Sequence, residues 1–408
     1  MRLIVIGGGA AGFFCAINAA KLNDRLEVTV VEKSGKLLSK VRVSGGGRCN
    51  VTHACFSIEE MIGKYPRGAN FIKKAFHRFF TTDTIDWFRE RGVALKTEED
   101  GRMFPITDSS ETIINCLLKE VDRYGIKVMM NREVKSLNKT GDAWRLVFSN
   151  GEVQEADKVC IACGGYPKLA MFDWIQQMGH TIEPPVPSLF TFNLPGDPVT
   201  ALMGIALPAA KIKIQGTKLE EEGPLLITHW GLSGPAVLKL SARGARELAD
   251  RNYQFTIRVN WAPAYHEQPL REKLQELRQE TPAQKISSRG ALGIPHRLWE
   301  YLCRISGIGE NLRWADLTSV SLGELVRKVN AQEFRVSGKT TFKEEFVTAG
   351  GIKLSEIDPN TMQSKLVPGL YFAGEVMDVD GITGGFNFQH AWTSGWVAAK
   401  GIVASLQV

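Results

Sequence analysis

Glycines near the start of the chain are spaced as in a phosphate-binding turn. An apolar run ends at Gly7, and Gly9 and Gly12 follow in the order Gly-x-Gly-x-x-Gly. Gly7 allows a tight turn, Gly9 lets backbone N–H groups approach a pyrophosphate, and Gly12 lets a helix pack closely on a sheet. A second apolar run ends at Glu32, where a carboxylate can accept hydrogen bonds from ribose hydroxyls. The spacing predicts a βαβ unit that binds FAD or NAD, and an ordinary strand-to-helix turn is the alternative.

Further glycine clusters favour the same kind of ligand. Residues 44–50 read Ser-Gly-Gly-Gly-Arg-Cys-Asn, in which the glycines permit close backbone approach and Arg48 supplies a cationic fork. Gly164 and Gly165 follow a predicted buried strand, where side chains would obstruct a ligand at the carboxyl edge of a sheet. Both clusters are therefore predicted to line a cofactor, although a flexible surface loop is the simpler alternative for residues 44–50.

The last cluster spans residues 374–387. Glu375 directly follows a predicted strand, a place from which a carboxylate can hold a ribitol hydroxyl. Gly384 and Gly385 open the final helix, whose N–H groups could stabilise negative charge at the N1–C2=O side of a reduced flavin. The acids at positions 378 and 380, taken singly, are equally consistent with capping or turn chemistry.

Length and composition exclude a small binding module. The chain has 408 residues, 44% of them hydrophobic, and a net charge of +6 spread along the sequence. No apolar run is long enough to span a bilayer and no secretory cleavage pattern follows the start, so we expect a cytoplasmic protein without a membrane partner. The seven cysteines are expected to be reduced, and no Cys/His spacing predicts a metal site. Cys160 and Cys163 have redox-motif spacing but lie in an apolar strand pattern, which argues against a dithiol.

Hydrophobic periodicity predicts an α/β fold with two inserted parts. A loop is expected over residues 36–50. Helices are expected over residues 58–61, 69–91, 110–124, 269–280, 295–306, 321–330 and 389–406. Strands are expected over 158–162 and 369–374, in a hairpin over 95–105, in a small antiparallel layer over 126–130, 133–138, 144–148 and 153–156, and in short segments at 190–194, 209–214, 223–227, 253–260 and 340–349. We divide the chain into a cofactor-binding part (1–189 and 348–408), a β-rich insertion (190–262 and 336–347) and a helical subdomain (263–335).

The sequence resembles the BaiN/YhiN-type bacterial FAD-dependent oxidoreductases. The resemblance rests on residues 7–12, 44–52, 228–235, 348–351 and 369–387, which together span the chain. It implies a Rossmann-like FAD-binding fold with an inserted β-barrel-like subdomain that itself carries the helical subdomain. It also implies a set of FAD contacts: Gly7, Gly9, Ala11, Gly12, Glu32, Lys33, Ser44, Gly46, Gly47, Asn50, Val134, Gly165, Glu375, Gly385, Phe386 and Asn387.

Within this set, Val134 would lie near the adenine. Two positions depart from the family pattern. His53 stands where Asn is common, and Cys163 precedes the Gly-Gly pair where Thr is usual. Both lie beside expected flavin contacts, so substrate preference could differ from that of other members.

A flavin accepts or donates a hydride at N5, so we expect a reductase or dehydrogenase acting on a small organic substrate such as a conjugated enone or an amine. Double-bond reduction needs a proton donor, and His53 and His229 are candidates because each lies in a motif loop expected to face the cofactor. A lone histidine is more often structural. A second complete fingerprint is absent, so NAD(P)H would donate electrons from an open cleft, unless another carrier or the substrate supplies them.

Two other function classes remain open. A FAD-dependent tRNA-modifying enzyme would need a clustered basic face, but basic residues over 271–297 alternate with acids, so a nucleic-acid partner is not expected. A non-catalytic flavin-binding redox protein would differ in showing no repeated turnover. Nothing in the sequence specifies an oligomeric state.

Overall fold

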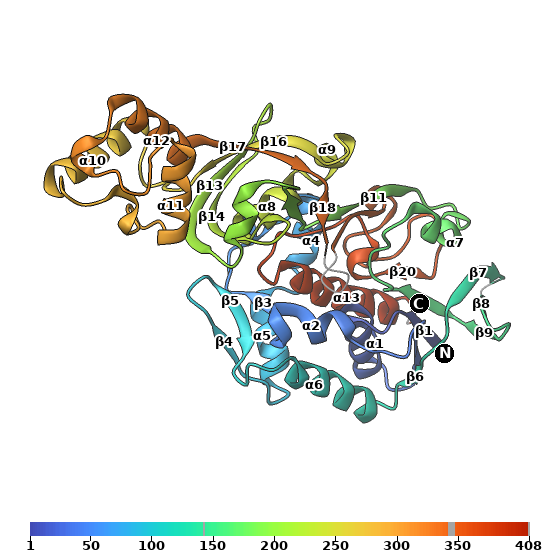
Figure 1. Cartoon of the computed structure of the whole chain (residues 1–408). Coiled ribbons are helices and arrows are strands. Elements are labelled where there is room, and N and C mark those ends of the chain that lie inside the picture. Colours follow the sequence, from blue (N-terminus) through green and yellow to red (C-terminus); the bar gives the residue numbers. More distant parts are fainter. Residues whose placement is uncertain (142, 342–346, 407–408) are drawn as a thin grey trace. The chain divides into compact units, whose positions relative to one another are not determined.

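A computed structural model describes residues 1–141, 143–341 and 347–406, and they form two compact units. Unit 1 comprises Met1–Ser188 and Phe342–Val408, so it holds both ends of the chain, drawn blue and red in Figure 1. Unit 2 comprises Leu189–Thr341. Among the described residues, no helix has both the length and the apolar character that crossing a bilayer requires.

A five-stranded parallel sheet forms the centre of unit 1. Its order is β20-β10-β1-β2-β6, with bounds β20 (Leu370–Phe372), β10 (Lys158–Ile161), β1 (Arg2–Ile6), β2 (Glu27–Val31) and β6 (Lys127–Met129). The strands are short apolar runs because both faces of such a sheet are covered. The predicted Rossmann-like α/β fold is confirmed. The placement of residues 126–130 in an antiparallel layer is wrong, because β6 extends the parallel sheet.

Two long helices bring the ends of the chain together. Helix α1 (Ala10–Leu22) follows the glycine turn, and α13 (Phe386–Ala404) follows the last glycine cluster. They pack side by side (Figure 1), and a Cβ added at Gly395 would lie 2.7 Å from the carbonyl oxygen of Ala11. Such close approach of two helices needs small residues at the contact. The N-termini of both helices belong to unit 1.

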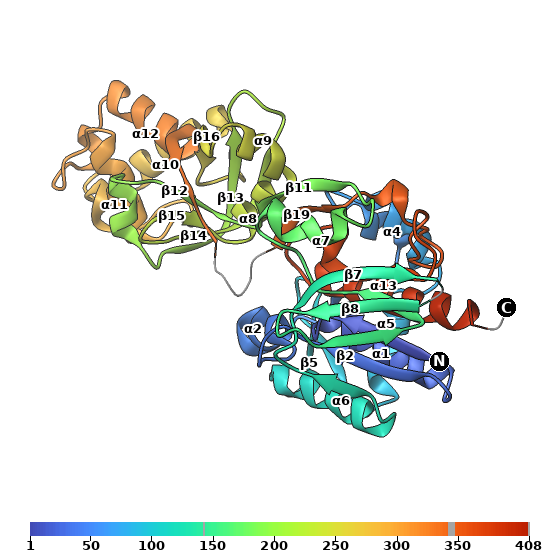
Figure 2. The same cartoon turned by 90° about the vertical axis from the view of Figure 1, so that its right-hand side faces the viewer.

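Smaller elements surround this core. Strands β7 (Val134–Thr140), β8 (Ala143–Phe148) and β9 (Val153–Ala156) form an antiparallel meander (Figure 2), as predicted for these three. Strands β3 (Thr52–His53), β5 (Arg102–Pro105) and β4 (Leu95–Thr97) form another sheet, and β11 (Ile182–Ser188) pairs with β19 (Val347–Ile352). The helices are α2 (Ser39–Gly47), α3 (Ile58–Ile62), α4 (Ala69–Phe76), α5 (Thr81–Arg89), α6 (Ser110–Arg123) and α7 (Asp173–Gln176). The loop expected over 36–50 is largely helix α2, and the single helix expected over 69–91 is two helices.

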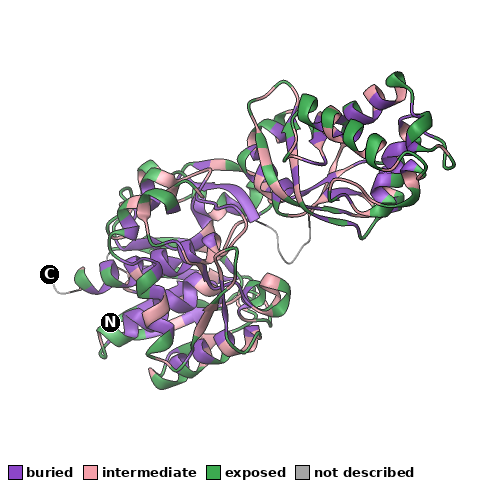
Figure 3. Ribbon diagram, turned by 90° about the vertical axis from the view of Figure 1, so that its left-hand side faces the viewer, coloured by how far each residue is buried: buried purple, intermediate pink, exposed green. Residues whose placement is uncertain are grey.

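Unit 2 is an antiparallel sheet with attached helices. The seven strands run in the order β17-β16-β13-β14-β15-β12-β18, with bounds β17 (Gln332–Ser337), β16 (Gln254–Asn260), β13 (Ala206–Ile214), β14 (Glu220–Ile227), β15 (Gly231–Ser233), β12 (Thr191–Asn193) and β18 (Lys339–Thr340). The helices are α8 (Pro235–Arg243), α9 (Ala245–Asp250), α10 (Glu267–Glu280), α11 (His296–Ile305) and α12 (Ser319–Ala331). Sheet and helices share one buried core (Figure 3).

The edges of this sheet meet at one residue. Strands β17 and β18 stand at opposite ends of the pairing order, yet only Gly338 separates them in the chain. The β-barrel-like form and the proposed subdomain boundaries stay predictions. Of the extended segment expected over 340–349, residues 342–346 lie outside the described residues.

Candidate functional site

The three glycines of the first turn have two different roles. A Cβ on Gly7, whose φ is +118°, would clash with the carbonyl of Ala162, and a Cβ on Gly12 would clash with the carbonyl of Gly7. These two glycines are therefore needed by the packing of the fold. Gly9 has an extended backbone, and a Cβ there would meet no atom within 4 Å. Because no side chain caps α1, open space lies beside a helix N-terminus that can accept an anion.

Glu32 is fixed at the end of β2 by backbone donors. Its Oε2 accepts from the N–H of Gly8 at 2.8 Å, and its Oε1 accepts from the N–H and the hydroxyl of Ser34 at 2.9 and 2.8 Å. Oε2 has a second lone pair available for a ribose hydroxyl, whereas Oε1 already accepts two hydrogen bonds. The carbonyl of Glu32 accepts from the N–H of Arg132 at 2.9 Å, which brings the start of β7, and with it Val134, close to the acid. The neighbouring amine of Lys33 lies 5.3 Å from the centre of the Tyr166 ring.

The cluster at residues 44–50 contains glycines that border open space and an arginine that is already paired within the protein. Gly46 and Gly47 have φ of +70° and +84°, and a Cβ on either would meet nothing within 4 Å. The hydroxyl of Ser44 donates to the carbonyl of Val41 at 3.1 Å. Arg48 does not offer the ligand-facing fork that the sequence suggested. Its guanidinium pairs with Glu98 at 2.6 Å and stacks 4.0 Å from the centre of the Phe104 ring.

Two asparagines hold the loop at the start of α13. Asn387 accepts from the N–H of Gly381 at 2.8 Å and donates to its carbonyl at 2.9 Å. With its amide assigned to satisfy its neighbours, Asn50 accepts from the N–H of Gly385 and donates to the carbonyl of Thr52, both at 2.9 Å. No side chain caps α13. The predicted FAD contacts of both residues stay predictions, and in this structure their side chains fix the uncapped helix start.

Glu375 joins three segments that are distant in the sequence. Its Oε1 accepts from the N–H of Thr348 at 2.8 Å, and its Oε2 pairs with the amine of Lys40 at 2.6 Å. A Cβ on Gly165 would lie 2.6 Å from the hydroxyl of Thr348 and 3.0 Å from Glu375. That hydroxyl is buried and has no hydrogen-bond partner among the residues the structure describes. Buried polar atoms are usually satisfied, so an unpaired one is consistent with a ligand binding here.

These features fit FAD. Unit 1 brings the four glycine clusters to the carboxyl side of its parallel sheet, where ligands of such sheets bind. The cluster residues leave open space at Gly9, Gly46, Gly47 and Gly164, and they present two uncapped helix N-termini. Ala11 is buried beneath them, and a Cβ on Gly374 would lie 2.8 Å from its side chain.

The two candidate histidines belong to different units. The ring of His53, in β3, stacks on Phe386 with centres 4.7 Å apart, and its Nδ1 lies 3.0 Å from the carbonyl oxygen of Gly384. His53 therefore lies beside the start of α13. His229 is exposed in the turn between β14 and β15 of unit 2, against Trp230. Only His53 belongs to the unit that carries the glycine clusters.

Residues 64–68 also hold the loop that leads into α13, and no motif in the sequence pointed to them. The guanidinium of Arg67 forms a two-pronged ion pair with Asp380, which also accepts from the hydroxyl of Ser188 at 2.9 Å. Tyr65 donates from its hydroxyl to the carbonyl of Phe386 at 2.7 Å. Burial raises the pKa of Asp380, although Arg67 acts in the opposite direction.

The cysteines are free thiols. Cys160 is buried in β10, and burial raises the pKa of Cys163 to about 11, which keeps that thiol protonated at neutral pH. Neither property suits a redox dithiol. Among the described residues, no group of three or more His, Cys, Asp or Glu side chains could hold a metal ion.

His390 makes the fold of unit 1 sensitive to acid. It is buried in α13, its Nε2 lies 3.2 Å from the carbonyl of Gly374, and its Nδ1 has no partner among the described residues. Burial lowers its pKa from 6.5 to about 4. The unfolded chain therefore binds more protons between these values, so stability is full above pH 6.5 and falls as the pH drops towards 4, by about 2–3 kcal/mol.

We expect His390→Gln to remove this acid-dependent loss, because a glutamine amide can donate to Gly374 without titrating. The measurement is the free energy of unfolding of the full chain at pH 7.5 and at pH 4.5. His77→Gln, a change at an exposed histidine, should behave like the wild type. Equal losses in all three proteins would contradict the prediction.

Comparison with known proteins agrees with this geometry. The family described as "HI0933-like protein Rossmann domain" matches residues 1–401. A protein of Haemophilus influenzae named ribosomal RNA dihydrouridine synthase is 32% identical, over 98% of this chain and 98% of its own length. A protein of Clostridium scindens named 3-dehydro-bile acid delta(4,6)-reductase is 26% identical, over the same shares of both chains.

A solved structure shares the fold at much lower identity. The 3-ketosteroid-delta4-(5alpha)-dehydrogenase of Rhodococcus jostii superposes with a TM-score of 0.52 and 12% identity, covering 97% of this chain and 96% of its own. This likeness concerns the fold alone. The match of the whole chain shows that the protein belongs to the HI0933-like family and is an oxidoreductase of the FAD-dependent class.

Proposed function

We propose that the protein reduces a carbon–carbon double bond conjugated with a carbonyl, and that its substrate is a uracil base in ribosomal RNA. The observation that carries the proposal is the pair of full-length relatives, whose names describe dihydrouridine formation and reduction of a bile acid double bond. Both reactions add a hydride and a proton across a double bond. The relative at 32% identity favours RNA over the bile acid class.

The residues of unit 1 would support this chemistry by binding and orientation. The turn at Gly9 would accept the pyrophosphate of FAD, and Glu32 would accept a ribose hydroxyl. FAD, when bound, supplies the hydride through N5. The uncapped start of α13 would stabilise negative charge on the reduced ring.

The sequence does not predict a nucleic-acid partner, because its basic residues alternate with acids. We propose one because the relative named ribosomal RNA dihydrouridine synthase matches this chain over 98% of both lengths. An RNA substrate is tested by incubating the protein, reconstituted with FAD, with ribosomal RNA transcribed in vitro and a chemical reductant of flavin. We expect dihydrouridine among the digested nucleosides, detected by mass as a gain of two hydrogens.

A parallel reaction with a small conjugated enone tests the double-bond chemistry separately from the RNA substrate. Reduction of the enone without dihydrouridine would reject RNA as the substrate and keep the double-bond chemistry. Reoxidation of the flavin by neither compound would reject both.

We propose His53 as the proton donor, because it is the candidate histidine that lies beside the start of α13. His53→Gln is expected to lower the rate of double-bond reduction by about 10²-fold, a typical contribution of a positioned acid. FAD content and the rate of flavin reduction should not change. His229→Gln is the matched control, and equal turnover in both variants would leave His53 only a positioning role.

We further propose that NAD(P)H reduces the flavin from an open cleft, since the chain carries one dinucleotide fingerprint. Anaerobic stopped-flow mixing with NADH and with NADPH should bleach the oxidised flavin band. If neither bleaches it within the turnover time, another donor supplies the electrons.

A further inference from the structure

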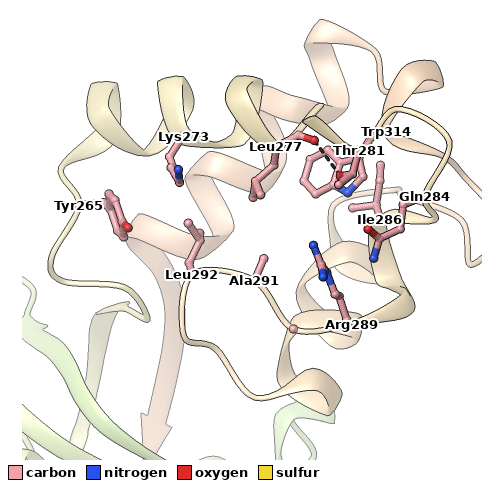
Figure 4. Close-up of a pocket in the computed structure, with 11 residues that line it drawn as sticks. Tyr265, Lys273, Leu277, Thr281, Gln284, Ile286, Arg289, Ala291, Leu292 and Trp314 are labelled. Carbon is pink, nitrogen blue, oxygen red and sulfur yellow. Dashed lines mark hydrogen bonds between the residues drawn. The ribbon is translucent and has the colours of Figure 1, made fainter. Parts of the chain in front are cut away.

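A cavity of about 290 Å³ lies in the helical part of unit 2 (Figure 4). It is bordered by α10, by residues 281–292 and by the turn at Trp314. None of the predicted FAD contacts lines it, because those residues all belong to unit 1. Its volume is close to the lower end of ligand pockets, roughly 300 Å³, which suits a ligand of one ring system with a small substituent.

The lining combines an aromatic face, an available cation and an amide. The half-buried ring of Tyr265 lies at one end of the cavity, and the guanidinium of Arg289 points into it (Figure 4). Arg289 has no hydrogen-bond or ion-pair partner among the described residues. Lys273 is less available, because its amine pairs with Glu276 at 2.7 Å. Gln284 donates from its amide nitrogen to Ser288 at 3.1 Å, which leaves its carbonyl oxygen free to accept.

The loop that carries Arg289 has a fixed backbone. A Cβ on Gly290 would clash with the carbonyl of Ile294, so the chain closes tightly there. Leu292, which also lines the cavity, has a φ of +58°, a left-handed conformation that is unfavourable for a leucine. Such conformations persist where the surroundings enforce them, and they are frequent at ligand sites.

We propose that this cavity binds one nucleotide unit, with its base on the ring of Tyr265 and its phosphate on Arg289. Aromatic rings stack on bases of any sequence, and arginine matches the geometry of a phosphate. The oxygen of Gln284 could accept from a base edge. The nucleotide is either free or an unstacked nucleotide of RNA, and the second source rests on the proposed function. Arg289 is exposed, so its guanidinium is accessible to a phosphate from solution.

The experiment compares Arg289→Gln with Arg327→Gln in the full chain. Both variants remove one positive charge from unit 2, but Arg327 pairs with Glu324 at 2.6 Å and does not line the cavity. The probes are UMP, a fluorescent RNA hairpin with one bulged uridine, and the same hairpin fully paired. Binding of UMP is measured by equilibrium dialysis and that of RNA by fluorescence anisotropy.

We expect Arg289→Gln to weaken binding of UMP or of the bulged hairpin about tenfold and to reduce the salt dependence of RNA binding by about one phosphate contact. Arg327→Gln should change either affinity by less than about twofold. If Arg289→Gln weakens the binding of UMP, a free nucleotide is sufficient to occupy the cavity. If it weakens only the binding of the bulged hairpin, the nucleotide that the cavity binds belongs to RNA. Equal affinities of the two variants, or no binding of any probe to the wild type, would overturn the proposal.

FAD content and enone reduction should be the same in both variants. This readout separates the two proposals, because a wild type that binds a nucleotide but reduces neither the enone nor ribosomal RNA would reject the proposed function and keep the cavity proposal. Intact enone reduction with no nucleotide binding would reject the cavity alone.

Discussion

Gly9→Val is expected to abolish FAD retention while leaving the polypeptide folded. The backbone of Gly9 is extended, which a valine tolerates, and a Cβ there meets no protein atom within 4 Å. The added side chain would therefore extend into the space proposed for the pyrophosphate. We expect the dissociation constant of FAD to rise at least about 100-fold, a loss of about 2.7 kcal/mol.

The measurement is the absorption spectrum of the purified protein, followed by titration of the apoprotein with FAD. Thermal unfolding of the apoprotein should change little, because valine in place of a glycine cap costs at most about 1 kcal/mol. Substitutions at two other glycines serve as controls. Gly309→Val, also at an open position, should retain FAD, whereas Gly12→Ala should fail to fold because its Cβ would clash with the carbonyl of Gly7.

Retention of FAD by Gly9→Val would place the cofactor elsewhere. A colourless wild type that binds no added FAD would contradict the assignment of the whole site.

Local backbone demands explain what the sequence could predict. Gly12 is required by its contact with the carbonyl of Gly7 inside the turn, and the positive φ of Gly7 also favours glycine, so their spacing identifies the βαβ unit. The second constraint on Gly7, its contact with Ala162 after β10, could not be predicted locally. The apolar runs that became β10 and β20 end at glycines. Burial on both faces is typical of parallel strands, and β10 pairs with β1 while β20 pairs with β10.

The parts that could not be predicted depend on residues far apart in the chain. The partner of Lys40 is Glu375, and Asn50 binds Gly385, in each case more than 300 positions away. Arg48 shows the same limit. An arginine suits an anion, but the direction of a long side chain depends on its neighbours. Here Glu98 pairs with the guanidinium and the ring of Phe104 stacks on it. Local composition also did not reveal α2, because three residues within it have non-helical dihedral angles.

Arg67→Met is expected to destabilise the protein by about 3–5 kcal/mol, the usual cost of removing one partner of a buried ion pair. Asp380 is fully buried and Arg67 nearly so. Without the guanidinium, the hydroxyl of Ser188 is the one side-chain partner left to the carboxylate among the described residues. The raised pKa of Asp380 shows that burial already disfavours its charged form with Arg67 in place. Without Arg67 the carboxyl should take up a proton more readily, so the loss of stability should shrink as the pH falls.

The free energy of unfolding from denaturant titration at pH 7.5 and pH 5 measures both effects. Arg132→Met is the matched control, because Arg132 makes an equally two-pronged pair with Glu152 at 2.6 and 2.9 Å, but on the surface, where such a pair contributes about 1 kcal/mol or less. Adding Asp380→Asn to Arg67→Met should recover much of the loss, since it removes the unpaired charge. Because Asp380 lies in the loop that leads to α13, the single variant should also lose FAD during purification, and the double variant should retain more of it. A loss in Arg67→Met no larger than that in Arg132→Met would mean that the ion pair does not stabilise the loop and that its other contacts, such as those of Asn387 and Tyr65, hold it.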